Sequence, residues 1–318
     1  MALPKILQDL TVPLIGAPLF IISSPELVIA QCKAGIVGAF PALNVRPAQK
    51  LEEWIVQIKS ELDLFQKANP SKKVAPFAVN QICHGSNNRL EHDLDICVKH
   101  EVPIIITSLQ ASQKVYDAVH SYGGIILHDV VNIRHTKKAL SMGADGIIAV
   151  CTGAGGHAGR LSPFALIPEI RRFHDGPLLL SGSMSTGGAI LAAEAIGADM
   201  AYMGTRFIAS KEANASDAYK ETIVSSSSKD IIYSSLFTGV HGNYLRQSIE
   251  AAGLDPDNLP TASKDAMNFG SGGNTDAKAW KDIWGAGQGV GSIDQALSVE
   301  RIVQNLKEEY EQAKQKLI

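Results

Sequence analysis

Short apolar runs alternate with longer amphipathic stretches along the first two-thirds of the chain. The runs are rich in small and β-branched residues, as strands are, and both faces of each run are apolar. Eight such runs predict strands, at residues 12–15, 35–40, 74–80, 102–107, 125–128, 146–150, 177–181 and 200–204. Strands that are apolar on both faces indicate a parallel sheet covered by helices.

The stretches between these runs have the length and patterning of helices. The first helix is expected after Ser24 and Pro25, because serine is a common N-cap and proline suits the first helical position. Further helices are expected at residues 47–68, 89–100, 111–121, 133–142, 163–173 and 187–196. Two α/β architectures compete, a closed (β/α)8 TIM barrel and an open doubly wound sheet. The eight alternations favour the barrel.

The alternation of apolar runs and helical stretches ends at a run of serines, residues 225–228. We expect the barrel to span residues 1–224 and residues 225–291 to form a smaller cap domain. The cap segment contains a polar, glycine-rich tract at 269–274 together with Trp280 and Trp284. A final helix with a charged outer face, residues 292–318, is expected to pack back on the barrel.

Composition and charge narrow the class of protein. The chain has 318 residues, 45% of them hydrophobic, and a formal net charge of −3, so it can bury a large core and has no general attraction to nucleic acid or to membranes. Residues 1–10 lack the apolar core of a secretory signal, and no apolar run is long enough to cross a bilayer. The four cysteines show no paired spacing. These features predict a cytoplasmic protein with reduced thiols.

The densest functional signal is a glycine-rich run just after the sixth predicted strand, at residues 153–160. So many glycines cost backbone entropy, so we expect this loop to approach a neighbour closely or to adopt positive φ angles. His157 lies within the loop, at the end of the barrel where active sites form. His157 is therefore the candidate catalytic residue, although a structural role for a loop histidine stays open.

Two further glycine-containing turns follow the seventh and eighth predicted strands. They are Ser181-Gly182-Ser183 and Met203-Gly204-Thr205-Arg206. In TIM barrels the loops after these two strands commonly bind phosphate through backbone N–H groups. The simpler interpretation is that both are tight turns between a strand and a helix. Their occurrence at the two expected positions favours a phosphate site.

Other cofactor and metal sites lack support in the sequence. The first strand is not followed by the glycine fingerprint of a Rossmann NAD site, and no phosphate-binding P-loop motif occurs. The histidines lack the spacing of metal ligands, so no metal site is predicted. His84 and His241 could line the mouth of a pocket.

Taken together, these motifs resemble the nitronate monooxygenase family, formerly called 2-nitropropane dioxygenases, and the related flavin-dependent enoyl-acyl-carrier-protein reductase. The resemblance covers most of residues 12–225. The matching segments, in the order of the family, are Gly16-Ala17-Pro18, Ser24-Pro25-Glu26-Leu27, Phe77-Ala78-Val79-Asn80, Ala154-Gly155-Gly156-His157-Ala158-Gly159, Ser181-Gly182-Ser183 and Met203-Gly204-Thr205-Arg206-Phe207.

The resemblance implies a TIM barrel that holds FMN without a covalent bond. It implies that the phosphate lies at the turns formed by Ser181, Gly182 and Ser183 and by Gly204 and Thr205. It also implies that the backbone of Ala17, Pro18 and Leu19, the Asn80 side chain, and Gly155 and Gly156 approach the flavin ring. His128 is carried over as a weaker flavin contact, because some relatives have a lysine where this chain has His128-Asp129; at the end of the sixth strand, where others have Gln or Asp, this chain has Val150.

For activity, the resemblance implies an FMN-dependent nitronate monooxygenase that oxidises alkyl nitronates with O2 through reduced flavin. In that function His157 takes the α-proton of a neutral nitroalkane. The alternatives are an FMN-dependent NAD(P)H reductase of an enoyl thioester or quinone, and a non-flavin barrel enzyme acting on a phosphorylated metabolite. The expected partners are a small-molecule substrate and O2, with neither nucleic acid nor membrane, and a homodimer is compatible with the sequence.

Overall fold

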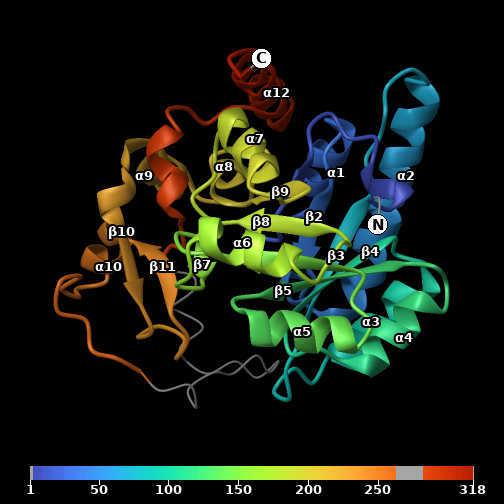
Figure 1. Cartoon of the computed structure of the whole chain (residues 1–318), viewed down its shortest axis with the longest axis horizontal. Helices are drawn as coiled ribbons and strands as arrows, with labels where there is room; N and C mark the ends of the chain where they lie inside the picture. The colour runs from blue at the N-terminus through green and yellow to red at the C-terminus, as the bar shows by residue number, and fades with distance from the viewer. Residues whose placement is uncertain (1–2, 263–281, 318) are drawn as a thin grey trace.

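A barrel of eight parallel strands forms the body of the protein in the computed structural model, which describes residues 3–262 and 282–317 (Figure 1). The strands are β1 (Leu14–Gly16), β2 (Gly38–Pro41), β3 (Phe77–Cys83), β4 (Ile104–Leu109), β5 (Ile125–Val130), β6 (Gly146–Val150), β8 (Leu178–Ser181) and β9 (Met200–Met203). Their order is β1-β9-β8-β6-β5-β4-β3-β2. A parallel bridge between Ile15 and Val37 brings the two edge strands together, and the Gly16 N–H donates to the Val37 carbonyl at 2.8 Å. The prediction of a barrel is confirmed, and the alternative of an open doubly wound sheet is wrong.

Alternate residues of the strands fill the interior of this barrel. A cluster of fully buried apolar side chains lies there, and its members are Leu7, Ile15, Val37, Ala39, Ala78, Ile104, Ile106, Leu127, Ile148, Leu179 and Met200. Leu7 comes from a short 3-10 helix, η1 (Lys5–Leu7), and the remaining members follow the period of two that strands impose. Residues at the intervening positions pack outward against the helices.

Helices follow the strands and cover the outside of the barrel. They are α1 (Pro25–Lys33), α2 (Leu51–Ala68), α3 (Leu90–Lys99), α4 (Gln113–His120), α5 (Ile133–Ser141), α6 (Pro163–Arg171), α7 (Gly187–Ala195) and the short α8 (Thr205–Ile208). Ser24 occupies the N-cap position of α1 and Pro25 its first turn, as expected from the sequence. Two further 3-10 helices, η2 (Ala42–Asn44) and η3 (Ala48–Lys50), lie between β2 and α2.

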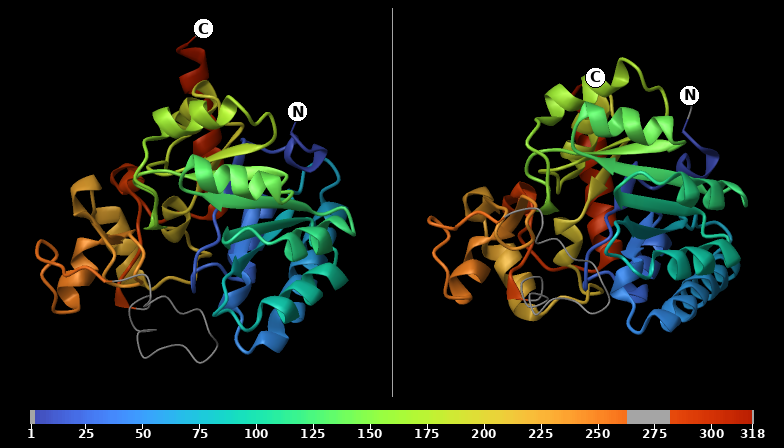
Figure 2. Two further views of the ribbon diagram at one scale, coloured as in Figure 1. Left: turned by 60° about the horizontal axis from the view of Figure 1, so that its bottom comes forward. Right: turned by 90° about the horizontal axis from the view of Figure 1, so that it is seen from below.

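A second sheet stands beside the carboxyl ends of the barrel strands (Figures 1 and 2). It has three antiparallel strands in the order β10-β11-β7, which are β10 (Ile231–Ser234), β11 (Gly242–Leu245) and β7 (Gly156–His157). The helices α9 (Asp217–Ser225) and α10 (Arg246–Ala251) lie near it, and the 3-10 helices η4 (Ser228–Asp230) and η6 (Gln288–Ser292) contact each other. The glycine-rich segment after β6 is therefore partly a strand, paired with the residues after 225.

The last helix, α12 (Val299–Gln315), packs on α7. It begins at Val299 rather than at residue 292, because Ser298 caps it by accepting the Arg301 N–H. The approach to α7 is so close that a Cβ on Gly187 would lie 2.1 Å from the Leu306 carbonyl oxygen. Of the predicted cap segment, residues 263–281, with Trp280 and the tract at 269–274, lie outside the described residues.

Candidate active site

A cavity of about 1740 Å³ opens at the carboxyl ends of the barrel strands, between the barrel and the second sheet. Most of the residues that the sequence predicts for the site line this one cavity. They are Ala17, Pro18, Leu19, Asn80, Gly155, Gly156, His157, Ser181, Gly182, Ser183, Gly204 and Thr205. The lining residues do not include His84, His241 or His128.

His128 faces away from the cavity, toward the helices. Its side chain is buried, and its Nδ1 atom lies 2.8 Å from Thr107 Oγ1 and 3.1 Å from the Tyr116 hydroxyl. Its neighbour Asp129 lines the cavity instead. Successive side chains of a strand point to opposite faces, so the inward set of β5 that includes Leu127 also includes Asp129 and excludes His128. This alternation is the signal in the sequence that would have identified Asp129.

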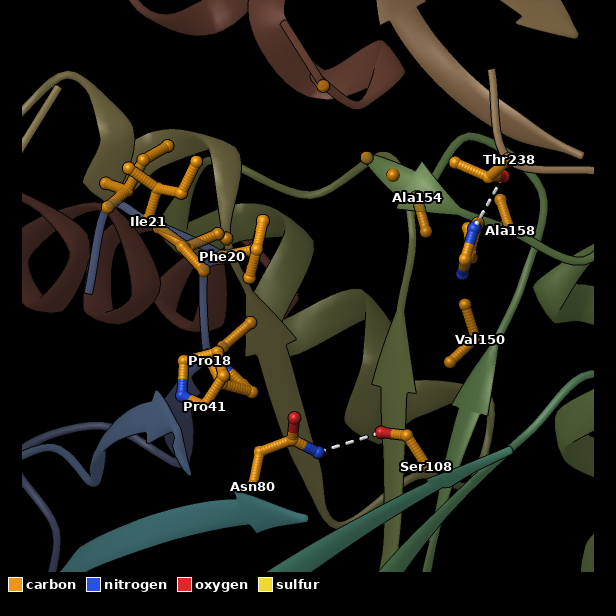
Figure 3. Close-up of a pocket in the computed structure, with 18 of the residues that line it drawn as sticks. Pro18, Phe20, Ile21, Pro41, Asn80, Ser108, Val150, Ala154, Ala158 and Thr238 are labelled. Carbon is orange, nitrogen blue, oxygen red and sulfur yellow. Dashed lines mark hydrogen bonds between the residues drawn. The ribbon is translucent and has the colours of Figure 1, made fainter. Parts of the chain in front are cut away.

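Polar side chains of three neighbouring strands form a chain of hydrogen bonds on the floor of the cavity. Asn80 Nδ2 donates to Ser108 Oγ at 2.8 Å and to the Ile106 carbonyl at 3.1 Å (Figure 3). Ser108 and the Leu109 N–H in turn hydrogen bond to the Asp129 carboxylate. Leu109 has a positive φ of 75°, a conformation that a leucine rarely adopts. The floor is thus held in one arrangement by side chain and backbone together.

Asp129 is a carboxyl group with an unusual proton affinity. Burial raises its pKa to about 6, because the charged form loses hydration, and the two hydrogen bonds it accepts counteract this only in part. The cavity floor can therefore hold a proton close to neutral pH. Perturbed carboxyl groups in cavities are typical of functional sites.

His157 is held by the second sheet. His157 pairs with Gly242 where β7 pairs with β11, and the adjacent Ala158 N–H donates to the His241 carbonyl at 3.1 Å. The His157 Nε2 atom lies 2.8 Å from Thr238 Oγ1 (Figure 3). Burial lowers the pKa of His157 to about 4, so the imidazole is neutral at pH 7. A neutral imidazole at a cavity wall can accept a proton.

The glycines of the 153–159 segment allow it to pack against other backbone. Gly153 has a φ of 77°, and its carbonyl accepts the N–H groups of Ser183 and Gln288. A Cβ on Gly155 would lie 2.9 Å from the Gly287 nitrogen. The expected close approach and positive φ both occur. A Cβ on Gly153 would meet the side chains of Ser183 and Gln288, whereas at Gly155 the neighbour is backbone.

The two predicted phosphate turns also meet at the cavity. Ser183 has a positive φ of 56°, and its N–H donates a hydrogen bond to the Gly153 carbonyl at 3.2 Å. The Thr205 hydroxyl accepts the Gly287 N–H at 2.9 Å. These contacts tie both turns to the 153–155 and 286–289 segments and give them fixed positions.

Aromatic side chains from segments outside the barrel strands line one side of the cavity. Tyr219 and Trp284 stack with ring centroids 4.8 Å apart, and the Tyr219 hydroxyl donates to the Gly285 carbonyl. Phe237 packs edge-on against Tyr244 on the same side and lines the cavity. Of these, only Trp284 was expected from the sequence to shape the pocket.

Within residues 3–262 and 282–317, no group of three or more His, Cys, Asp or Glu side chains is arranged to hold a metal ion. Among the helices of the same ranges, none combines the length and the apolar character needed to span a membrane.

The fold and the cavity define a TIM-barrel protein with a large pocket at the carboxyl ends of its strands. A family model, "Nitronate monooxygenase", matches residues 5–309. The chain belongs to the nitronate monooxygenase family, and this membership makes it an oxidoreductase of the flavin type.

Relatives in sequence are distant but cover much of the chain. A nitronate monooxygenase from Paraburkholderia phytofirmans is 25% identical, over 95% of this chain and 94% of its own length. A (3aS,4S,5R,7aS)-5-hydroxy-7a-methyl-1-oxo-octahydro-1H-indene-4-carboxyl-CoA dehydrogenase from Rhodococcus jostii is also 25% identical, over 78% of this chain and 67% of its own length.

Solved structures show the same fold. FabK from Thermotoga maritima superimposes with a TM-score of 0.77 at 22% identity, covering 98% of this chain and 96% of its own. Nitroalkane oxidase from Streptomyces ansochromogenes superimposes with a TM-score of 0.79 at 22% identity, covering 96% of this chain and 98% of its own.

Proposed function

We propose that this protein is an FMN-dependent nitronate monooxygenase that uses O2 as its oxidant. One observation carries the proposal: His157, the two glycine-containing turns and the Asn80 side chain all line the same cavity. Family membership and the nitronate monooxygenase from Paraburkholderia phytofirmans support the same substrate class.

The residues around the cavity fit FMN. The turns at Gly182-Ser183 and Gly204-Thr205 lie together at one side of the cavity and would hold the phosphate. The apolar surface of Ala17, Pro18 and Val150 suits a flat heteroaromatic ring, and Asn80 offers a polar contact to its edge (Figure 3). In this proposal His128, which faces the helices, makes no contact with the flavin.

The cavity has room for a second ligand beside FMN. Ligand sites usually measure about 300–1,000 Å³, and this cavity is larger, at about 1740 Å³. The additional space is bordered by apolar side chains from residues 19–22 and from the segment after 225, among them Phe20, Ile21, Leu236 and Phe237. We propose that an alkyl substrate binds there and that residues 225–291 act as its cap.

His157 supplies the proton chemistry in this proposal. Bound FMN would supply the electron-accepting chemistry and the reaction with O2. An alkyl nitronate already carries its negative charge and needs only to be oriented, whereas a neutral nitroalkane must first lose its α-proton. The neutral imidazole of His157 takes that proton.

The test is the visible spectrum of the purified protein, followed anaerobically with propionate 3-nitronate and with NADPH in separate cuvettes. We expect a yellow protein whose flavin absorbance bleaches with the nitronate and is restored by O2. Rapid bleaching by NADPH alone would contradict the monooxygenase.

The second candidate is an FMN-dependent NAD(P)H reductase of an enoyl thioester or quinone. The large, partly apolar cavity favours it, because a long acyl chain would fit beside the flavin. Anaerobic bleaching of the flavin absorbance by NADPH would favour this reductase over the monooxygenase. A colourless protein that fails to take up added FMN would instead favour a barrel enzyme acting on a phosphorylated metabolite.

A further inference from the structure

Four neighbouring strands of the barrel each bring one side chain to the floor of the cavity. Asn80 of β3, Ser108 of β4, Asp129 of β5 and Val150 of β6 all border it, and these strands are adjacent in the sheet in that order. In the proposed function Asn80 and Val150 contact the flavin ring (Figure 3). A flat ring that reaches from β3 to β6 must cross β4 and β5. Asp129 therefore lies next to the ring.

Asp129 is a buried carboxyl group whose hydrogen-bond donors are both uncharged. They are the Ser108 hydroxyl and the Leu109 N–H. Among the described residues, no lysine or arginine is near enough to lower its pKa. Leu109 makes its bond with a positive φ of 75°, and backbone strain of this kind clusters at functional sites. The carboxylate thus borders the cavity as a negative charge without a counter-ion.

Titratable groups on three other elements interact with this charge. They are Cys83 of β3, Tyr116 of α4 and Tyr202 of β9. Burial raises the pKa of Cys83 and of Tyr116 to about 12, and it raises the pKa of Tyr202 well above the ordinary value of a tyrosine. All three therefore stay protonated and uncharged in the range in which enzymes are assayed.

The basic side chains near the cavity do not neutralise the carboxylate either. Burial lowers the pKa of His128 and of His157 to about 4, so both are neutral at pH 7. Arg89 borders the cavity but forms an ion pair with a buried aspartate four residues further along the chain, and Arg46 is exposed. His135 of α5 also borders the cavity, so an experiment must separate its proton from that of the carboxyl group.

We propose that Asp129 is a redox-linked proton acceptor, whose carboxylate takes up one proton when bound FMN accepts two electrons. The inference rests on the proposed function for the presence of FMN. The electrons come from the nitronate, which is oxidised, or in a titration from dithionite, which is oxidised to sulfite. The ring gains two electrons and one proton from water and so keeps one negative charge. A second proton passes from water to Asp129 through the cavity.

Repulsion between two negative charges is the physical cause of this uptake. The pKa of Asp129 is already raised to about 6 by burial, and a negative charge added to the adjacent ring raises it further. A group that binds its proton more tightly in the reduced protein makes reduction more favourable as pH falls. Asp129→Asn is neutral at every pH, so it removes this dependence and leaves that of the flavin and of His135 in place.

The first test is the equilibrium reduction of the FMN-loaded proteins by dithionite, with a reference dye, from pH 5 to pH 9. We expect the wild type and D129N to have similar equilibrium constants near pH 5, where Asp129 is protonated in both redox states. At pH 8 we expect the constant of the wild type to be at least about tenfold lower, which is about 30 mV for a two-electron couple. The matched control is D117N, because Asp117 is an exposed carboxylate of α4 that does not border the cavity. It should follow the wild type.

The second test observes the proton directly and does not depend on a variant that folds. The infrared difference spectrum of reduced minus oxidised wild type, at pH 7 and with ¹³C-labelled aspartate, should show a protonated carboxyl band that shifts with the label. A wild-type spectrum without that band would overturn the inference, and so would a constant difference between the wild type and D129N at every pH. Either result in a yellow protein that turns over nitronate would leave the proposed function standing. A protein that takes up no FMN would overturn both.

Discussion

His128 and Asp129 are consecutive in the sequence but lie on opposite faces of β5. The imidazole contacts Thr107 and Tyr116 on the helix side, while the carboxyl group borders the cavity and hydrogen bonds to Ser108. The acidic residue, not the basic one, is thus available to a ligand. It gives the floor of the cavity a group that titrates near neutral pH.

We predict that Asp129→Asn stabilises the protein at alkaline pH and not at acidic pH. The pKa of Asp129 is raised to about 6 in the folded state, against about 3.9 for an unfolded aspartate, so the folded state binds the proton more tightly. The free energy of unfolding of the wild type therefore falls as pH rises from about 4 to 6. Urea unfolding of the FMN-free proteins should give a difference of about 1–3 kcal/mol at pH 8 that vanishes near pH 4. A difference independent of pH would contradict the assignment.

We predict that His157→Ala lowers turnover of a neutral nitroalkane much more than turnover of its nitronate. Loss of a general base costs roughly 10²–10⁴-fold on a neutral nitroalkane, whereas the nitronate, which needs no base, should keep much of its turnover. Steady-state rates on nitroethane and ethyl nitronate measure the separation. Equal losses on both would indicate that His157 binds substrate or supports the structure.

The pH dependence of the wild type gives an independent check on His157. Its pKa is lowered to about 4 by burial, and a base works only when it is unprotonated. We therefore expect kcat/KM for the nitroalkane, corrected for ionisation of the substrate, to stay level from pH 8 to about 5 and to fall as pH approaches 4. A fall centred near pH 6.5 that persists in Asp129→Asn, which lacks the other group titrating in this range, would contradict the lowered pKa of His157.

Local patterning was sufficient to predict the barrel. The apolar runs and the helices between them are encoded residue by residue, and the parallel strands left few ways to connect them. The glycine turns after β8 and β9 could be placed at the cavity because strand ends in a barrel meet at one edge. The strand period would also have separated Asp129 from His128.

Contacts with the second sheet could not be predicted in the same way. Gly156 and His157 form a strand only because β11 pairs with them, and Thr238 reaches His157 across 81 positions of the chain. Neither segment carries a local signal for the other. The same holds for the stacking of Tyr219 on Trp284, which brings two distant segments to one wall.

We predict that Asn80→Asp weakens FMN binding. The Asn80 amide donates to the Ile106 carbonyl and to Ser108, and a carboxylate could donate to neither. It would also place a negative charge beside that carbonyl and near Asp129, so the floor must rearrange. Fluorescence titration of the FMN-free protein should show a Kd at least about tenfold higher, equivalent to about 1.4 kcal/mol. Ser108→Ala, which removes one acceptor and leaves the Asn80 amide neutral, should have the smaller effect.

The packing of the glycine-rich segment on the 286–289 segment leads to the last prediction, for Gly155→Ala. The new methyl group would lie 2.9 Å from the Gly287 nitrogen and 3.0 Å from the Ala286 carbonyl carbon, and backbone atoms cannot turn aside as a flexible side chain does. We expect a loss of about 1–3 kcal/mol in the free energy of unfolding, as for overpacked interiors, together with weaker FMN binding. The matched control is Gly85→Ala, because a Cβ there would meet nothing within 4 Å and the residue has no positive φ. Equal thermal midpoints for the two variants would show that the two segments can separate without cost, and His157, two residues away, would then lack the rigid support that its proposed role requires.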